Sequence, residues 1–224
     1  MSGTPARRAW LFVLLATAIG CDGDREVAMG EGAAAARAAA TASDSGEADV
    51  AGQRAHMIRE DGIGDARIGM TIGELRAALR PDITVGTLAP YMVDIDALPV
   101  VQGDDTVYHV LIVAGEPSSD DAPIELLATS HRGVRTEDGV GPGDTLADAA
   151  AAWGEPRLSY NTNDESREWA TFPALPPSIM VRVMPADDSA WFAGIYATQH
   201  EFNATDRYDP AARITMIMVR RHAP

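Results

Sequence analysis

Two stretches of the chain share one local plan, which constrains the fold more than any other feature. Glu60–Arg80 and Glu137–Pro156 each run Glu-Asp-Gly, an aliphatic residue, Gly, a second Gly, and then a Thr that opens a helical pattern. Thr71 is followed three residues later by Glu74, the spacing of a capping box, and Thr145 can cap the second helix with its hydroxyl. The sequence therefore predicts two short helices that begin at equivalent threonines.

The spacing of apolar residues gives each predicted helix one buried face. Gly154 and Pro156 end the second helix, because Gly tolerates positive φ and Pro cannot continue a helix. Pro81 ends the first helix in the same way. The predicted faces are Ile72, Leu75 and Leu79 in the first helix, and Leu146, Ala149, Ala150 and Trp153 in the second.

Short strand-like runs follow each helix, so the predicted fold class is α+β. We expect two similar halves, residues 57–130 and 131–224, each a short capped helix followed by an antiparallel β-meander. The run Val107–Val113 is apolar on both alternating faces except for His109, which favours a central strand. The expected strands are Ile83–Leu88, Tyr91–Ile95, Val107–Ala114, Ile124–Ser130, Arg157–Tyr160, Glu168–Phe172, Ile179–Met184, Trp191–Ala197 and Ile214–Val219.

The N-terminus has the pattern of a secretion signal. Arg7 and Arg8 precede an uncharged run, Ala9–Ile19, that is too short to span a bilayer as a mature helix. The four residues that end at Cys21, Ala-Ile-Gly-Cys, resemble the lipobox of bacterial lipoproteins. This resemblance implies that residues 1–20 are a lipoprotein signal peptide and that Cys21 is the lipid attachment point.

Cysteine usage supports the same interpretation. Cys21 is the only cysteine, whereas an exported protein that uses disulfides normally carries an even set. The alternative is an ordinary cleaved signal that happens to end near a cysteine. Residues 21–56 are predicted to be the lipidated Cys and a disordered tether, because the segment is rich in Ala, Gly and acidic residues and poor in large apolar ones.

The charge balance restricts the partners. The chain has a formal net charge of −15, and removal of Arg7 and Arg8 with the signal makes it −17. Such a surface repels nucleic acid and anionic headgroups. We therefore expect no nucleic-acid partner and contact with the membrane through the lipid anchor only.

Short motifs at both helices resemble those of small envelope lipoproteins of the SmpA/OmlA (BamE-like) group. They are Gly69-Met70-Thr71 and Gly143-Asp144-Thr145 at the helix starts, and Trp153-Gly154-Glu155-Pro156 at the second helix end. The turn Thr136–Gly143 is also similar to that of uncharacterised bacterial lipoproteins. The resemblance implies a binding or scaffolding module of the cell envelope.

Patterns typical of catalysis or metal binding are weak. The chain has no lysine and no G-x-S-x-G motif, and its histidines at 56, 109, 131, 200 and 222 form no pair at helical ligand spacing. The acidic pairs Asp104-Asp105, Asp120-Asp121 and Asp187-Asp188 lack the alternation of a calcium loop. We therefore predict no catalytic residue, no metal, no cofactor and no enzymatic activity.

Aromatic residues near the C-terminus are the most site-like group. Trp191, Phe192, Tyr196 and Phe202 lie in a loop-rich region, and such side chains are enriched in interfaces. They could instead fill a core. The preferred function is a lipid-anchored, non-enzymatic binding or scaffolding module with an envelope protein partner, facing the periplasm or the cell surface. The alternatives are a small-ligand or cation binder and, less favoured, an envelope hydrolase.

Overall fold

The computed structural model describes residues 56–187, 189–197 and 200–221. The signal peptide, Cys21 and the predicted tether therefore lie outside the described residues. Among the residues that are described, no helix is both long enough and apolar enough to cross a membrane.

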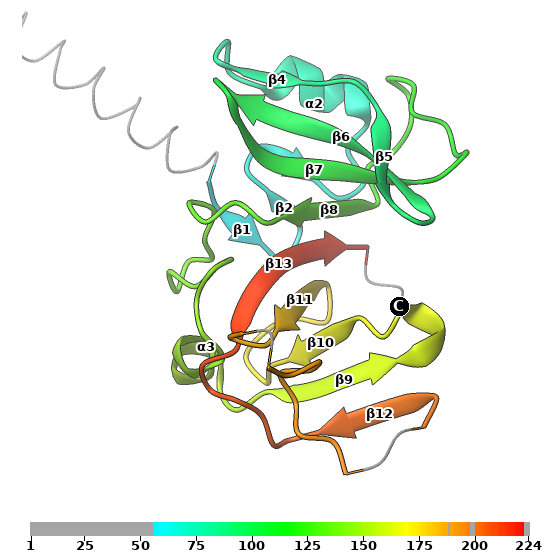
Figure 1. The fold of residues 1–224 in the computed structure, drawn as a ribbon. Helices are drawn as coiled ribbons and strands as arrows, with labels where there is room; N and C mark the ends of the chain where they lie inside the picture. The colour runs from blue at the N-terminus through cyan, green and yellow to red at the C-terminus, as the bar shows by residue number, and fades with distance from the viewer. Residues whose placement is uncertain (1–55, 188, 198–199, 222–224) are drawn as a thin grey trace, which may run out of the picture. The chain divides into compact units, whose positions relative to one another are not determined.

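Most of the described chain forms one ten-stranded antiparallel sheet (Figure 1). The strand order is β12-β9-β10-β11-β13-β8-β7-β6-β4, and β5 pairs with β6. The strands are β4 (Ile83–Val85), β5 (Ala89–Met92), β6 (Ile95–Gln102), β7 (Asp105–Val113), β8 (Leu126–Thr129), β9 (Arg157–Asn161), β10 (Glu168–Thr171), β11 (Ile179–Met184), β12 (Phe202–Thr205) and β13 (Arg213–Arg220).

A second, three-stranded sheet precedes the large one in the chain. Its strands are β1 (Ile58–Arg59), β2 (Gly62–Ile63) and β3 (Ala66–Arg67), each of two residues. β2 lies against β8 and β13, and Ile63 is fully buried. The small sheet therefore covers the middle of the large one. Strands this short carry too little pattern to be predicted from sequence.

Both predicted helices form with the predicted caps. The N–H of Glu74 donates to Thr71 Oγ1 at 3.1 Å, and that of Thr71 donates back to Glu74 Oε2 at 2.8 Å, which opens α2 (Ile72–Ala78). Thr145 and Asp148 make the same reciprocal pair at the start of α3 (Leu146–Trp153). Each helix thus satisfies two of its free N–H groups locally.

The two helix starts also share their longer-range backbone hydrogen bonds. In each, two N–H groups donate to carbonyls at or just before the start of a central strand, which fixes the helix beside β8 or β13. The bonds, 2.7–3.0 Å long, run from Gly69 to Ile124 and Ile72 to Ala122, and from Gly143 to Ile214 and Leu146 to Ala212.

The two faces of the large sheet carry separate apolar cores. The main core includes the buried faces of both helices, among them Leu75 and Trp153. The Trp153 indole N–H donates to Asp138 Oδ2 at 3.0 Å, which ties the helix to its preceding Glu-Asp-Gly turn. The minor core lies on the opposite face and contains strand residues only, including Leu111, Met216 and Met218. No helix of the described chain contributes to it.

The predicted architecture of two helix-plus-meander halves is wrong. β8 and β13, one from each predicted half, pair directly, so all ten strands form a single sheet, and the helices have only seven and eight residues. Two separate meanders would each leave an edge strand with unpaired N–H and C=O groups. Pairing β8 with β13 satisfies both edges, and Leu127 and Val219 are completely buried there.

Candidate functional site

The candidate site is built on the connection between β11 and β12. The sequence predicts a strand over Trp191–Ala197, but this segment is a loop with one isolated bridge, Gly194 to Tyr208. Its remaining backbone bonds also reach the 205–209 segment: Ile195 N–H donates to Arg207 O at 2.7 Å, and Asp209 N–H donates to Ala193 O at 2.8 Å. The loop is therefore fixed to the segment after β12 without forming a strand.

A buried carboxylate on β10 holds this loop. Glu168 is only 4% exposed and accepts three hydrogen bonds, from Ala193 N–H at 2.6 Å, Gly194 N–H at 2.8 Å and Tyr196 O–H at 2.8 Å. Buried carboxylates are costly unless their oxygens are satisfied in this way. The three donors satisfy both oxygens of the carboxyl group and define the loop conformation.

Burial raises the pKa of the Glu168 carboxyl above its ordinary value, and the three hydrogen bonds oppose that shift. Burial also raises the pKa of the Tyr196 hydroxyl, to which the bonded Glu168 carboxylate adds. Each oxygen of Glu168 is already occupied by a loop donor. The carboxylate is thus placed to position the loop.

Gly194 lies where a Cβ atom would be crowded on three sides. A Cβ atom there would lie 2.8 Å from Glu168 Oε1, Thr205 Cγ2 and Tyr196 Cε2. Contacts below 3.0 Å to three atoms cannot be relieved by moving one side chain. The close approach of the loop backbone to Glu168 therefore depends on this glycine.

Three aromatic rings pack around the held loop. Tyr160 on β9 stacks on Phe192 with ring centroids 4.1 Å apart and an interplanar angle of 13°. Tyr196 meets both rings edge-on, 4.7 Å from Tyr160 and 5.6 Å from Phe192. These geometries are the favourable ones for aromatic pairs. Phe192 and Tyr196 belong to the loop, so their packing on Tyr160 gives the loop an aromatic base against β9.

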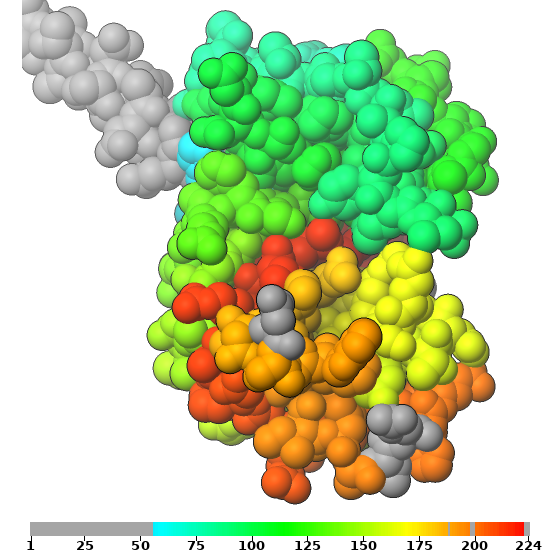
Figure 2. Space-filling model, viewed as in Figure 1, coloured from blue at the N-terminus to red at the C-terminus, as the bar shows by residue number. Residues whose placement is uncertain are grey.

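Trp191 projects from this base into solvent. It is 94% exposed, the highest value among the exposed large apolar side chains of the described chain. Beside it is a shallow hollow of about 360 Å³ that Tyr160, Phe192, Gly194, Ile195 and Tyr196 also line. We call Trp191, Phe192 and Tyr196, which the buried Tyr160 ring supports from below, the aromatic surface. The orange atoms of the loop are on the visible face in Figure 2.

Phe202 is separated from the other three predicted site residues. Successive residues of a strand point to opposite faces. Asn203 on β12 pairs with Tyr160, whereas Phe202 pairs with Asn161, so Phe202 faces away from the Tyr160 ring. It is 63% exposed. The structure thus brings Trp191, Phe192 and Tyr196 together and leaves Phe202 on the other face.

Sequence reasoning missed two members of the site, Glu168 and Tyr160. Glu168 is the first residue of a predicted strand and is followed by Trp169 and Ala170. Tyr160 lies directly opposite Glu168 in the β9–β10 pair. The sequence signal for Glu168 is its position two residues before the apolar Ala170, which places both side chains on the same face of the strand. That position predicts an inward-facing acid, which requires hydrogen-bond donors.

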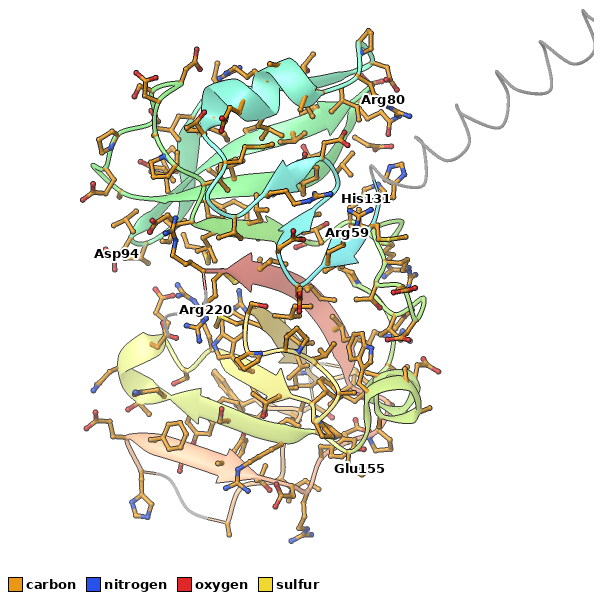
Figure 3. The ribbon with its side chains drawn as sticks, turned by 180° about the vertical axis from the view of Figure 1, so that it is seen from behind. Arg59, Arg80, Asp94, His131, Glu155 and Arg220 are labelled. Carbon is orange, nitrogen blue, oxygen red and sulfur yellow. The ribbon has the colours of Figure 1, made fainter. Side chains whose placement is uncertain are left out.

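Histidine and acidic side chains outside the aromatic surface are the other candidates for chemistry. In the described part of the chain, no three His, Cys, Asp or Glu side chains gather in an arrangement that could hold a metal ion. His56 and His131 stack with ring centroids 6.2 Å apart, but His131 Nδ1 accepts from the Gly133 N–H at 3.1 Å. His131 and the solvent-facing Glu155 are labelled in Figure 3.

Comparison with known proteins adds no identification. No family model matches the chain, and neither does any curated protein or solved structure. The function must therefore be argued from the site itself.

Proposed function

We propose that this protein is a lipid-anchored, non-enzymatic binding module of the bacterial cell envelope, and that it contacts an envelope protein partner through the aromatic surface. The observation that carries the proposal is Trp191, 94% exposed on a loop that the buried Glu168 holds in place. The Trp191 ring buries almost no area in the monomer, so it contributes little to the stability of the monomer. Exposed Trp and Tyr are typical of interface hot spots.

The surrounding geometry supports binding. The loop bonds to Glu168 and to the 205–209 segment, so a partner would meet an already ordered surface. Such preorganisation lowers the entropy cost of association. The resemblance to SmpA/OmlA lipoproteins and the lipobox-like sequence that ends at Cys21 support the envelope location and the anchor.

The test compares two exposed aromatic residues on opposite faces. Wild type, Trp191→Ala and Phe202→Ala are produced with the anchor intact, and partner proteins are captured from the native envelope after crosslinking. We expect Trp191→Ala to reduce recovery of the captured partner at least tenfold, because hot-spot Trp residues contribute about 2 kcal/mol or more. Phe202→Ala is the matched control and should retain wild-type recovery.

Two results would contradict the proposal. Equal losses in both variants would show that the aromatic surface is not the contact. Turnover of peptidoglycan, ester or phosphate substrates by the purified protein would exclude the non-enzymatic assignment. Trp191→Ala should leave the free energy of unfolding within about 0.5 kcal/mol of wild type, since the side chain is exposed.

A further inference from the structure

A second cavity, away from the aromatic surface, lies where β7 ends and β8 begins. Its volume is about 670 Å³, within the range of roughly 300–1,000 Å³ found for small-molecule sites. The loop that connects the two strands closes one side of it, and Ile95 at the start of β6 contributes to the lining. It shares no lining residue with the hollow beside Trp191.

The floor of this cavity is apolar and continuous with the minor core. Ile95, Leu111 and Leu126 line the cavity and also belong to, or pack against, that core. Val113, directly opposite Ile95 in the β6–β7 pair, is 57% exposed there. Both helices contribute to the other face of the sheet, so no described helix covers these side chains. A ligand with an apolar body would remove them from water.

The rim of the cavity is acidic. Glu116, Asp121 and Glu125 line it, and Glu125 has a partner, Arg221, at 3.5 Å. Within the described residues, the side chains of Glu116 and Asp121 have neither a hydrogen bond nor an ion pair. The chain also has a net charge of −15. Both the local and the global field therefore favour a cation at the cavity mouth and disfavour an anion.

We propose that this cavity binds a small cationic amphiphile: a molecule with an apolar chain that lies on the Leu111 and Leu126 floor and an ammonium group beside Glu116 and Asp121. The size of the cavity, its apolar floor and its two unpaired carboxylates each match one part of such a ligand. The site is independent of the proposed partner contact at Trp191. Either assignment can fail without the other.

Octylamine, a cation at neutral pH, is the probe. Its binding to the full mature chain is measured by isothermal titration calorimetry below its micellar concentration, with octanoate and butylamine alongside. We expect octylamine to bind at least tenfold more tightly than octanoate. Each added methylene between butylamine and octylamine should tighten Kd about fourfold, as expected for burial of a CH₂ group.

The charge requirement is tested with a matched pair of double variants. Glu116→Gln/Asp121→Asn removes two rim charges, and Asp104→Asn/Asp105→Asn removes two charges from the turn at the opposite end of β7. The first pair should weaken octylamine binding at least tenfold and the second by no more than twofold. All four side chains are exposed, so thermal unfolding should be unchanged and any loss is a loss of binding.

Three results would overturn the proposal: no octylamine binding at millimolar concentration, octanoate binding as tightly as octylamine, or equal losses in the two double variants. A second copy of the chain is the other occupant to exclude. It would appear as concentration-dependent dimerisation that the Glu116→Gln/Asp121→Asn variant strengthens.

Discussion

Glu168 provides the sharpest test of the structure, because a single side chain is bonded to three donors of the loop that carries Trp191. Glu168→Ala removes all three acceptor contacts. Glu168→Gln keeps one carbonyl oxygen but replaces the other with an NH₂ group, which cannot accept. The two variants therefore remove different fractions of the same interaction without altering any aromatic ring.

The expected cost follows from the burial of the donors. In Glu168→Ala the Ala193 N–H stays buried without an acceptor, which costs about 1–3 kcal/mol. Gly194 N–H and Tyr196 O–H are partly exposed, so water can replace their acceptor, at about 0.5–1 kcal/mol each. The free energy of unfolding should fall by about 3 kcal/mol in Glu168→Ala and about 1–2 kcal/mol in Glu168→Gln.

Urea unfolding and hydrogen exchange measure these effects together. The amides of Ala193 and Gly194 should lose protection in both variants, most in Glu168→Ala. Glu155→Gln is the matched control, because Glu155 accepts one tyrosine hydroxyl, from Tyr208 at 2.7 Å, near the surface. A loss below 1 kcal/mol in Glu168→Ala, with unchanged amide protection, would refute the role assigned to this carboxylate.

The pH dependence of the free energy of unfolding tests the direction of the Glu168 pKa shift independently. Burial raises the pKa of Glu168 in the folded chain, so the folded state binds its proton more tightly than the unfolded state does. The contribution of this group is therefore most favourable below its ordinary unfolded pKa and is lost as pH rises through the raised folded pKa. The stability of wild type relative to Glu168→Gln should decrease over this interval. An increase in this relative stability with pH would contradict the raised pKa of Glu168.

Three further predictions concern separate parts of the chain. Cys21→Ser should release the protein from the membrane fraction, and retention there would refute the lipoprotein assignment. Thr145→Ala should lower the free energy of unfolding by about 1 kcal/mol in urea titrations, because the Asp148 N–H loses its cap. Gly194→Ala should lower it by about 1–3 kcal/mol through overpacking against Glu168, and an unchanged value would show that the loop can move away.

Features encoded by neighbouring residues could be predicted from the sequence. The capping pair at Thr71 and the Gly154 end of α3, with φ of 84°, involve residues close in the chain, and both are present in the structure. The run Val107–Val113, apolar on both faces except for His109, correctly predicted an interior strand, since β7 lies between β6 and β8. Local chemistry is sufficient to predict such features because the interacting groups are close in sequence.

Features set by distant partners could not be predicted. Trp191–Ala197 has the composition of a strand, yet two of its N–H groups, those of Ala193 and Gly194, bond to Glu168, more than twenty residues earlier. β6 was largely missed because Pro99 interrupts its apolar run, although Pro99 occupies a ladder position opposite His109. The pairing of β8 with β13 joins apolar strands whose sequences specify burial but no neighbour. Which strands become neighbours in the sheet depends on the packing of the whole chain.

The roles of Glu168 and Trp191 can be separated by a double-mutant cycle on partner capture. If Glu168 acts only by holding the loop, Glu168→Gln weakens binding because the partner must then order the loop, and Trp191→Ala weakens it by removing the contact itself. Once Trp191 is absent, ordering that part of the loop brings little benefit, so Glu168→Gln should cost less in the Trp191→Ala background than in wild type. Additive losses, measured as recovery of the same captured partner, would instead mean that Glu168 and Trp191 contribute to binding independently, and the loop-holding account of Glu168 would fail.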